Sequence, residues 1–458
     1  MTTAVVISLD PVPDPLAVLG RFADRGSPIL LHSAAPGHPL SRYSYLAANP
    51  VATLLRDADG WSEVAGVIRQ SLASPGAVLP ELPPFQGGWA GWFGYELGRA
   101  FDTMQCASGE GSGAPDVALA LYDWVIAWDH AVDRAWLVST GIDAGGDRDP
   151  DRAAQRARTV FETVAGIGST PPASRAGQPR GESVTRADFT PDEYRTAVAR
   201  VVEHVRAGDI FQANISQRFI REFTADPLEL YRALVARSPA PMAAFVAHLP
   251  HHALSVSPER FVRFTPTTRE IETRPIKGTR PRGSTAVEDA ALAHDLSSSV
   301  KDRAENVMIV DLLRNDLARV AVTGTVETPS VCALETHPTV HHLVSTVTAQ
   351  LRPGLDALDL LAATFPGGSV TGAPKIRAME VIASIEPVRR GVYCGAIGWI
   401  GLDGALDTSI AIRTITLDGH DASYHAGGGV TALSSPEGEH LETLDKARAL
   451  AAALEEVG

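Results

Sequence analysis

Two pairs of acidic residues have a spacing that places each pair on one face of a helix. Asp302 and Glu305 are three residues apart, as are Glu439 and Glu442, and such residues project from the same side of an α-helix. Either pair alone is typical of a solvated helix face. If the pairs meet in the folded chain, their repulsion favours a cation that prefers oxygen ligands. Because the sequence has no His/Cys cluster, we expect Mg²⁺ rather than Zn²⁺.

Two glycine-rich segments could bring backbone N–H groups close to an anion. The first, FPGGSVTGAPK at residues 365–375, lacks the GK[ST] ending of the phosphate-binding loop found in nucleoside triphosphatases. A turn before a helix can still offer N–H groups to a carboxylate. The second, HAGGGV at residues 425–430, is either a close approach of backbone to a ligand or a plain tight turn.

Four isolated residues are further candidates. Arg413 lies in the apolar run IAIRTI, where a buried guanidinium needs a counter-charge that an anionic substrate could supply. His342 lies in HHLVSTV and Glu259 in SVSPERF. Lys277, in TRPIKGTRPRG, is either one more solvated charge or a reactive amine. By themselves these residues indicate only an anion-binding metalloenzyme, since no hydrolase motif centred on serine or cysteine is present.

The elements that must position these residues alternate irregularly between helix and strand. TPDEYRTAVARVVEHVRAGD predicts a helix with Thr190 as N-cap, a capping box completed by Glu193, and an end at Gly208. The next strand alternates apolar residues with polar ones, a pattern that usually meets water but can line a polar cavity. Its polar residues are Gln212, Asn214 and Ser216. The mixture predicts an α+β fold or a large α/β sandwich rather than a βα-repeat barrel.

One compositional break divides the chain. Residues 166–184 are rich in Gly, Ser and Pro and predict a linker or long surface loop. Before it, residues 1–165 have short β-like runs and a few helices and predict a mostly β region. Residues 185–458 form the second region, which holds the candidate chemistry.

Composition excludes several classes of protein. The 458 residues carry a net charge of −14 without a run of basic residues, so nucleic acid is not an expected partner. The sequence has neither a signal-peptide pattern nor an apolar stretch long enough for a membrane span. The three cysteines, Cys106, Cys332 and Cys394, are far apart and read as free thiols of a reducing compartment. We therefore expect a cytoplasmic protein.

The order of the motifs resembles the chorismate-utilising enzymes. The similarity covers essentially everything after Phe189 and rests on nine segments: GDIFQANISQRF, SVSPERF, TRPIKGTRPRG, KDRAENVMIVDLLRNDLARV, HHLVSTV, FPGGSVTGAPK, RRGVYCGAIGW, TSIAIRT and HAGGGV with SPEGEHLETLDKA. The resemblance implies a large α/β sandwich of two antiparallel β-sheets with helices outside, in the α+β class. Residues 185–458 would then be the chorismate-binding catalytic region, while residues 1–165 resemble the N-terminal region of the anthranilate-forming members.

The resemblance also implies roles for individual residues. Mg²⁺ would be held mainly by Glu305 and Glu442, with Asp302 and Glu439 in support, and would bind one carboxylate of chorismate. Glu259 matches the general acid that protonates the departing C4 hydroxyl, a poor leaving group without help. His342 and Thr371 match residues that line the reacting ring. The implied contacts to substrate are Gln212, Tyr393, Arg413, Gly427, Gly428, Gly429 and Lys446.

Two positions indicate which reaction of the family to expect. Gln212 lies where the isochorismate and salicylate branch has a lysine that activates water, and a glutamine cannot act as that base. Lys277 lies in PIKGT, which is typical of the branch that aminates chorismate at C4, whereas the anthranilate-forming branch has PIAGT. In the C4 branch the lysine amine is thought to add at C2 while the C4 hydroxyl leaves, and ammonia then attacks C4. This requires the neutral amine, which nearby positive charge and partial desolvation would favour. In an extended strand Arg274 and Arg280 point away from Lys277 and would not tune it.

The remaining expectations concern other ligands and partners. The chain shows no glutaminase motif, so the resemblance implies ammonia from a separate glutamine amidotransferase subunit. The N-terminal segments ILLHSAAPGHPLSRYSYLAANP and FQGGWAGWFGYELGR resemble those of the branch that aminates chorismate at C4. In some members the first segment frames a tryptophan pocket, although the same motif fits a packed core. The corresponding residues are Ser33, Leu40, Ser41, Arg42, Tyr43, Pro241, Met242 and Ala243.

Overall fold

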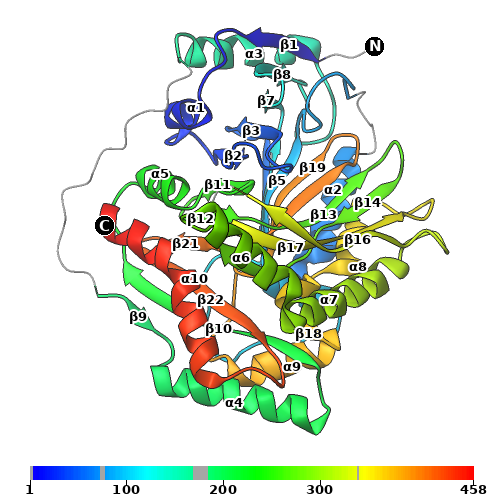
Figure 1. Ribbon diagram of the computed structural model, residues 1–458. Coiled ribbons are helices and arrows are strands. Elements are labelled where there is room, and N and C mark those ends of the chain that lie inside the picture. The colour runs from blue at the N-terminus through cyan, green and yellow to red at the C-terminus, as the bar shows by residue number, and fades with distance from the viewer. Residues whose placement is uncertain (1–3, 73–77, 169–183, 338–339) are drawn as a thin grey trace.

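Two antiparallel β-sheets form the framework of the protein in a computed structural model (Figure 1). The structure describes residues 4–72, 78–168, 184–337 and 340–458. Most of the expected linker at residues 166–184 therefore lies outside the described residues. Within the described chain, no helix combines the length and the apolar character needed to cross a bilayer.

The larger sheet has twelve strands and contains parts of both predicted regions. In spatial order its strands are β1 (Val5–Leu9), β8 (Arg134–Ser139), β7 (Trp124–Asp129), β3 (Tyr43–Ala47), β2 (Ile29–His32), β11 (Met242–His248), β12 (His251–Ser257), β21 (Thr414–Asp418), β22 (Asp421–Val430), β10 (Gln212–Glu222) and β18 (Gly372–Ala373), with β9 (Arg186–Ala187) paired to β10. The N-terminal strand β2 pairs directly with β11.

The smaller sheet has ten strands and mixes the two regions in the same way. Its order is β15 (Ile276–Pro281), β17 (Val340–Gln350), β14 (Glu270–Thr273), β13 (Arg260–Thr265), β20 (Leu406–Ile410), β19 (Ala396–Gly401), β5 (Gly88–Phe93), β6 (Val117–Tyr122) and β4 (Ala52–Arg56), with β16 (Glu327–Thr336) paired to β17. Because β5 pairs with β19, the N-terminal region completes both sheets.

Apolar side chains fill three layers around these sheets. Tyr45 and Val246 from the larger sheet join Trp92 and Trp399 from the smaller sheet in the layer between them. Two outer layers lie beneath the helices. The helices are α1 (Pro15–Phe22), α2 (Trp61–Leu72), α3 (Pro150–Val164), α4 (Pro191–Ala207), α5 (Pro227–Arg237), α6 (Ala286–Ser298), α7 (Val300–Ala318), α8 (Ala357–Thr364), α9 (Lys375–Ile385) and α10 (Pro436–Val457), with 3₁₀ turns η1 (Ala58–Gly60), η2 (Tyr95–Ala100) and η3 (Gly368–Val370). The predicted sandwich with helices outside is confirmed.

Local signals explain where the helix before the site begins and ends. Thr190 and Glu193 form the predicted capping box of α4, and Gly208 ends the helix in the left-handed conformation at φ 83°. The following strand, β10, is buried on both faces along most of its length. Its polar face, which includes Gln212 and Asn214, is therefore enclosed within the protein and does not meet water.

Close packing of backbones in the middle of the smaller sheet depends on Gly91 and Gly398, which lie opposite each other on β5 and β19. Gly91 has φ +153°, and a Cβ there would overlap the carbonyl oxygen of Ala118 on β6. A Cβ on Gly398 would likewise overlap the Asp407 carbonyl of β20. These strands can pair at this position only because both side chains are absent.

We expect Gly91→Ala to lower the free energy of unfolding by about 3 kcal/mol or more, because the new methyl group cannot be accommodated without backbone movement. Gly66→Ala is the matched control, since Gly66 is exposed within α2 and a Cβ there meets nothing within 4 Å. The control should be stabilised by about 0.5–1 kcal/mol. Urea and thermal denaturation measure both, and an unaltered midpoint for Gly91→Ala would contradict the strand register.

Candidate active site

The glycine-rich segment, residues 365–374, connects the two sheets at the predicted site. Asn214, on β10 of the larger sheet, donates its backbone N–H to the Thr371 carbonyl at 2.7 Å. Lys277, on β15 of the smaller sheet, donates its Nζ to the Ser369 carbonyl at 2.9 Å. The segment therefore brings residues of both sheets into one site.

The two predicted carboxylate pairs do meet, and lysines lie between them. Lys301 Nζ is 3.9 Å from Glu305 and 3.5 Å from Glu439, so it spans helices α7 and α10. Lys446 Nζ is 2.7 Å from Glu442. Oε1 of Glu305 is buried and has no hydrogen-bond partner. The site thus holds a cluster of acids that is only partly neutralised by the protein.

Gly428 on β22 leaves the space that two of these acids occupy. A Cβ there would lie 2.9 Å from Glu439 Oε2 and 3.4 Å from Glu442 Oε1. Burial raises the pKa of Glu305, although Lys277 and Lys301 act in the opposite direction. Burial acts in the same way on Glu442, but the charges of Lys446, Lys301 and Lys277 and the hydrogen bond from Lys446 together outweigh it and lower the pKa of that carboxyl. The acids therefore differ in how readily they ionise.

Asp302 has a different setting from the three glutamates. Its Oδ2 pairs with Arg280 Nη2 at 3.2 Å, and the same guanidinium pairs with Asp295 at 2.6 Å. Asp302 is thus engaged by an arginine of β15. This position fits an indirect role in a metal site better than a direct one.

Lys277 lies in an irregularity of its strand. Ile276 pairs with Val344 and Thr279 pairs with His342, so one extra residue of β15 is accommodated between them. Such a β-bulge re-aims side chains, and Gly278 within it has φ +89°. Burial lowers the pKa of Lys277, while the carboxylates of Glu305 and Glu259 oppose this. Desolvation is the largest influence that favours the neutral amine, and the positive charge of Lys446 acts in the same direction.

The amines of the chain are concentrated at this site. The sequence contains four lysines, Lys277, Lys301, Lys375 and Lys446, and 36 arginines. Three of the lysines belong to the acid cluster described above, and Lys375 forms a buried ion pair with Asp316 at 2.6 Å. Cationic side chains elsewhere in the chain are therefore guanidinium groups.

Glu259 is buried between β12 and β13. Burial raises its pKa to about 7, although a hydrogen bond from the Ser369 side chain and the charge of Lys277 lower it. A carboxyl group with this pKa is partly protonated at neutral pH and can act as a general acid. The backbone carbonyl of Glu259 accepts the Ile410 N–H at 3.0 Å, which fixes its place in the fold.

The two residues expected beside the reacting ring are also buried. The Nδ1 of His342 is 2.9 Å from the Thr279 hydroxyl. Burial, followed by the charge of Arg413, lowers the pKa of His342 to about 3, so the imidazole is neutral. The Thr371 hydroxyl donates to the Gly367 carbonyl at 3.1 Å.

Gln212 faces the glycines of the neighbouring strand. A Cβ at Gly429 would overlap Gln212 Nε2, so the glycine makes room for this amide. The amide oxygen Oε1 is buried and has no hydrogen-bond partner. A buried acceptor of this kind is suited to a bound donor.

Arg413 retains a free guanidinium. The residue is half-buried with φ +50°, and burial lowers its pKa. No hydrogen bond or ion pair to its side chain occurs within the described residues. Nearby, Tyr393 is buried and stacks on His425 with ring centroids 4.9 Å apart, while Lys446 donates to the Gly427 carbonyl at 2.8 Å. Arg413 is thus available to a substrate anion.

A second feature is a cavity of about 410 Å³ between the sheets. Seven of the eight residues named for a tryptophan pocket line it: Ser33, Leu40, Arg42, Tyr43, Pro241, Met242 and Ala243. Ser41 does not line it; its backbone N–H donates to the His38 carbonyl at 2.9 Å. The segment therefore borders a cavity and not a filled core.

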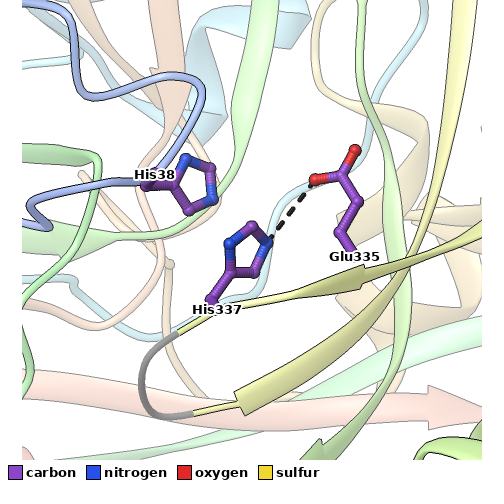
Figure 2. A group of neighbouring side chains, drawn as sticks. All are labelled: His38, Glu335 and His337. Atoms are coloured by element: carbon purple, nitrogen blue, oxygen red, sulfur yellow. Dashed lines mark ion pairs between the residues drawn. The ribbon is translucent and has the colours of Figure 1, made fainter.

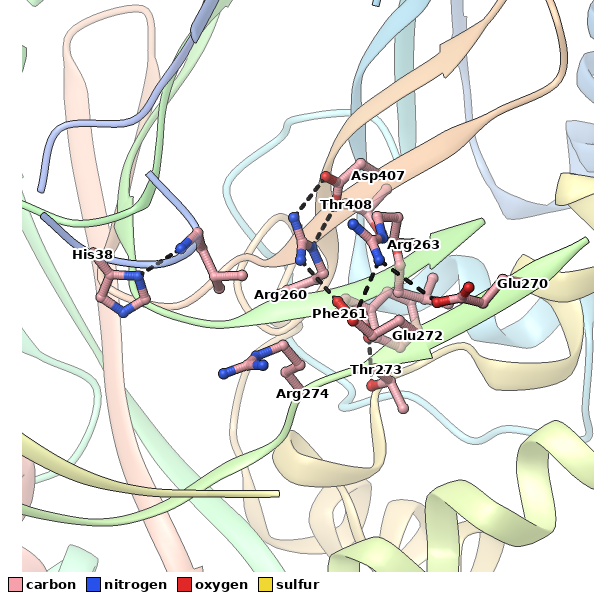
Figure 3. A network of polar contacts seen from close by, with 12 residues as sticks. His38, Arg260, Phe261, Arg263, Glu270, Glu272, Thr273, Arg274, Asp407 and Thr408 are labelled. Atoms are coloured by element: carbon pink, nitrogen blue, oxygen red, sulfur yellow. Dashed lines mark hydrogen bonds and ion pairs between the residues drawn. The ribbon is translucent and has the colours of Figure 1, made fainter. Parts of the chain in front are cut away.

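One wall of the cavity carries a fixed ion-pair network (Figure 3). Arg260 donates to Asp407 at 2.9 and 3.0 Å and to Glu272 at 3.0 Å. Arg263 donates to Glu272 at 3.3 Å and is also 3.9 Å from Glu270. The cavity thus combines an apolar lining with one charged wall, where ion pairs within the protein hold the arginine side chains in place.

His38, Glu335 and His337 form another polar group (Figure 2). Each of these side chains offers one atom that could bind a metal ion, and the three atoms lie within 4.8 Å of one another. In the part of the chain that the structure describes, this is the group of His, Cys, Asp or Glu side chains with that geometry. Burial lowers the pKa of both imidazoles, and Arg274 lowers it further. Arg274 also pairs with Glu335. A divalent cation would have to displace this arginine, so the group is better explained as a link between the N-terminal loop and β16.

Several residues of the site carry no signal in the sequence pattern. Lys301 and Ser369 contact predicted residues through side chains and backbone that only the fold brings together. Arg390 pairs with Glu386 at 2.7 Å, fully buried behind the segment of residues 365–374. Its position inside RRGVYCGAIGW could have marked it, since a charged residue beside an apolar strand needs a partner if buried.

Comparison with known proteins agrees with this geometry. A family model described as chorismate binding enzyme matches residues 27–452. The aminodeoxychorismate synthase component 1 of Salmonella typhimurium is 41% identical, over 91% of each chain. The anthranilate synthase component 1 of Streptomyces coelicolor is 40% identical, over 93% of this chain and 83% of the relative.

A solved structure shows the same fold at the level of the whole chain. Anthranilate synthase component I from Streptococcus pneumoniae superposes with a TM-score of 0.78 and 32% sequence identity, covering 89% of this chain and 92% of that one. The family model covers the segments that hold Glu259, Lys277 and the acid cluster. The protein belongs to the chorismate-binding enzyme family.

Proposed function

We propose that the protein aminates chorismate at C4 to form 4-amino-4-deoxychorismate, a precursor of 4-aminobenzoate and hence of folate. The observation that carries this proposal is the setting of Lys277, a half-buried amine beside a protonatable Glu259 and an acid cluster. Together these groups supply a nucleophile, an acid and a carboxylate-rich position for a metal ion. Similarity to aminodeoxychorismate synthase component 1 supports the same reaction.

Substrate binding follows from the unpaired cation of the site. Chorismate carries two carboxylates, and Arg413 offers a guanidinium without an internal partner. One carboxylate would pair with Arg413, next to Tyr393 and the Gly427–Gly429 backbone. A bidentate pair of this kind fixes orientation as well as charge. The neutral His342 lies beside Arg413 without adding positive charge.

The reaction then uses Glu259 as the acid and Lys277 as the nucleophile. The neutral amine of Lys277 adds at C2, the two conjugated ring double bonds shift, and the C4–O bond breaks as Glu259 transfers its proton to the departing oxygen, which leaves as water. Ammonia adds at C4, both double bonds shift back, and the Lys277 amine is expelled from C2. The added nitrogen thereby ends at C4.

The acid cluster fits Mg²⁺. Its donors are carboxylate oxygens, the ligands that Mg²⁺ prefers, and Glu305 Oε1 is buried without a hydrogen-bond partner. Glu305 and Glu442 would hold the ion, with Glu439 beside them and Asp302 acting indirectly through its pairing with Arg280. Bound Mg²⁺ would neutralise the second carboxylate of chorismate. Lys301 would have to yield part of its contact with the acids.

Amination at C2, which gives anthranilate, is the second candidate function. It is favoured by the 40% identity to an anthranilate synthase component 1. Lys277 argues against it, because that branch of the family typically has alanine there. Water addition at C2 is disfavoured as well, since the buried amide of Gln212 cannot remove a proton.

Ammonia would come from a separate glutamine amidotransferase subunit. Two observations support this proposal. The related synthases are named component 1, which implies a second component, and the sequence lacks a glutaminase motif. The net charge of −14 and the free cysteines are consistent with a cytoplasmic enzyme that binds neither nucleic acid nor a membrane.

The cavity between the sheets supports a second ligand, and we propose tryptophan. A volume of about 410 Å³ is in the range of small-molecule sites, and its lining includes Tyr43, Met242 and Trp399. Arg263 at the wall is 38% exposed at its side chain and could meet the tryptophan carboxylate. Indole would pack against the apolar residues.

Incubating the purified protein with chorismate, Mg²⁺ and ammonium should yield 4-amino-4-deoxychorismate. Adding the lyase that releases 4-aminobenzoate should convert this product completely, as followed by chromatography and mass spectrometry. EDTA should abolish turnover, and Mg²⁺ should restore it. Direct appearance of anthranilate would overturn the assignment to C4.

Lys277→Ala and Lys277→Arg should each reduce C4 amination by about 100-fold or more, because neither leaves a neutral amine to attack C2. Both should keep the thermal midpoint of the wild type, since the position lies in a bulge. Unchanged turnover in either variant would remove the covalent role.

The same hypothesis is tested by pH-dependent amine labelling followed by mass spectrometry. The pKa of Lys277 is lowered, whereas Glu439 and Glu305 outweigh burial and raise the pKa of Lys301. Only the neutral amine reacts, so labelling of Lys277 should begin at lower pH than labelling of Lys301.

Tryptophan should raise the thermal midpoint of the protein by preferential binding to the folded state. Met242→Trp, which fills the cavity from β11, should eliminate this shift and leave C4 amination intact. A shift of equal size in the variant, or none in the wild type, would contradict the tryptophan site.

A further inference from the structure

Ser369 contacts both residues that carry the proposed chemistry. Its side chain forms a hydrogen bond with the Glu259 carboxyl group, and its backbone carbonyl accepts the Lys277 amine at 2.9 Å. Ser369 itself is buried, with 7% of its surface exposed. It lies in η3, in the middle of the segment that joins the two sheets.

We propose that Ser369 is a positioning residue that holds the acid Glu259 and the amine Lys277 in fixed register. The proposal rests on the proposed function. Ser369 contacts Glu259 through its hydroxyl and Lys277 through its backbone carbonyl. The distance between the acid and the amine is therefore limited by the short distance between two groups of one residue. The Glu259 carboxyl also accepts the backbone N–H of Ile276, next to Lys277, which supports the same register.

The residues after Ser369 are held tightly by the larger sheet. The Val370 carbonyl accepts Arg390 Nη1 at 2.9 Å, and Arg390 Nη2 donates to the Asn214 carbonyl at 2.6 Å. Glu386 fixes this guanidinium at 2.7 Å and also accepts the Ser216 N–H at 2.8 Å. Because the whole group is buried, η3 is tied to β10 on this side.

Packing and a second ion pair hold the segment elsewhere. A Cβ on Gly368 would come within 2.8 Å of Leu312 on α7, so the backbone lies directly on that helix. Lys375, just after the segment, donates to the Thr364 carbonyl at 2.9 Å and to Asp316 at 2.6 Å. Ser369 is therefore presented by a rigid support, which precise placement of catalytic groups requires.

The hydroxyl also has a chemical consequence for proton transfer. When Glu259 gives its proton to the C4 oxygen, a buried carboxylate remains, and water leaves. The Ser369 hydroxyl can donate to that carboxylate, and Lys277 is the charged side chain that faces it within the described structure. Burial raises the pKa of Glu259, and the hydroxyl limits this rise. The arrangement stabilises the charge that develops on the acid.

Ser369→Ala removes the hydroxyl and keeps the carbonyl that binds Lys277, so it tests the hold on the acid alone. We expect kcat for chorismate consumption to fall about 10- to 100-fold, with KM for chorismate within about threefold of the wild type. An acid must be protonated to act, and the variant lacks the hydroxyl that lowers the pKa of Glu259. The alkaline limb of the pH profile should therefore move to higher pH. Ser369→Thr, which restores a hydroxyl, should recover most of the rate.

Ser71→Ala is the matched control, because Ser71 is also buried and hydrogen-bonded, to Ile68 and Trp89 in the N-terminal region. It should lose stability without a change in kcat or in the alkaline limb. An unchanged kcat in Ser369→Ala, or a loss of rate with the limb unmoved and no recovery in Ser369→Thr, would overturn the proposal. The rate of total chorismate consumption tests the role of Ser369, because the C4 hydroxyl leaves in either amination. The identity of the product tests the proposed function separately.

Discussion

Repulsion among the carboxylates of Glu305, Glu439 and Glu442 is the constraint around which the site is built. Three acids in a partly dehydrated space cannot remain ionised without compensating charge. Lys301 and Lys446 supply part of it, and the buried Oε1 of Glu305, which has no hydrogen-bond partner, indicates that the compensation is incomplete. The same field acts on Lys277, where it opposes the effect of burial on the amine. A cation added to the cluster would relieve the acids and weaken their hold on the Lys277 proton.

The sandwich brings these groups together from distant parts of the chain. Helices α7 and α10 present the acids, β15 presents the amine, and β10 presents the buried amide of Gln212. The N-terminal strands take part in both sheets, so they support the site although none of its proposed reacting groups comes from them. The cavity between the layers arises from the same arrangement, because β2, β11, β13 and β19 enclose it.

Local patterns predicted the local parts of this structure. The capping box of α4 and the helical spacing of Asp302 and Glu305 depend on neighbours within a turn, and both are found. The triple glycine was ambiguous from sequence because a turn and a strand interior both tolerate glycine. It lies within β22, where Gly429 makes room for Gln212.

Features that depend on long-range pairing could not be predicted in this way. Alternation along β10 usually marks a wet face, yet Asn214 is enclosed because the segment of residues 365–374 packs across it. The link through Ser369 likewise needs two strands of different sheets to meet at one loop. Asp302 likewise has a neighbour, Arg280, that no spacing rule supplies.

The bulge at Lys277 separates the choice of chemistry from the stability of the framework. Residues on either side of it pair with β17, while Lys277 and Gly278 are absent from the pairing register. The side chain at this position can therefore change without disturbing the ladder. An exchange of this side chain leaves the flanking pairs of Ile276 and Thr279 in place, so relatives with this fold can carry different residues here while the rest of the sheet keeps its packing.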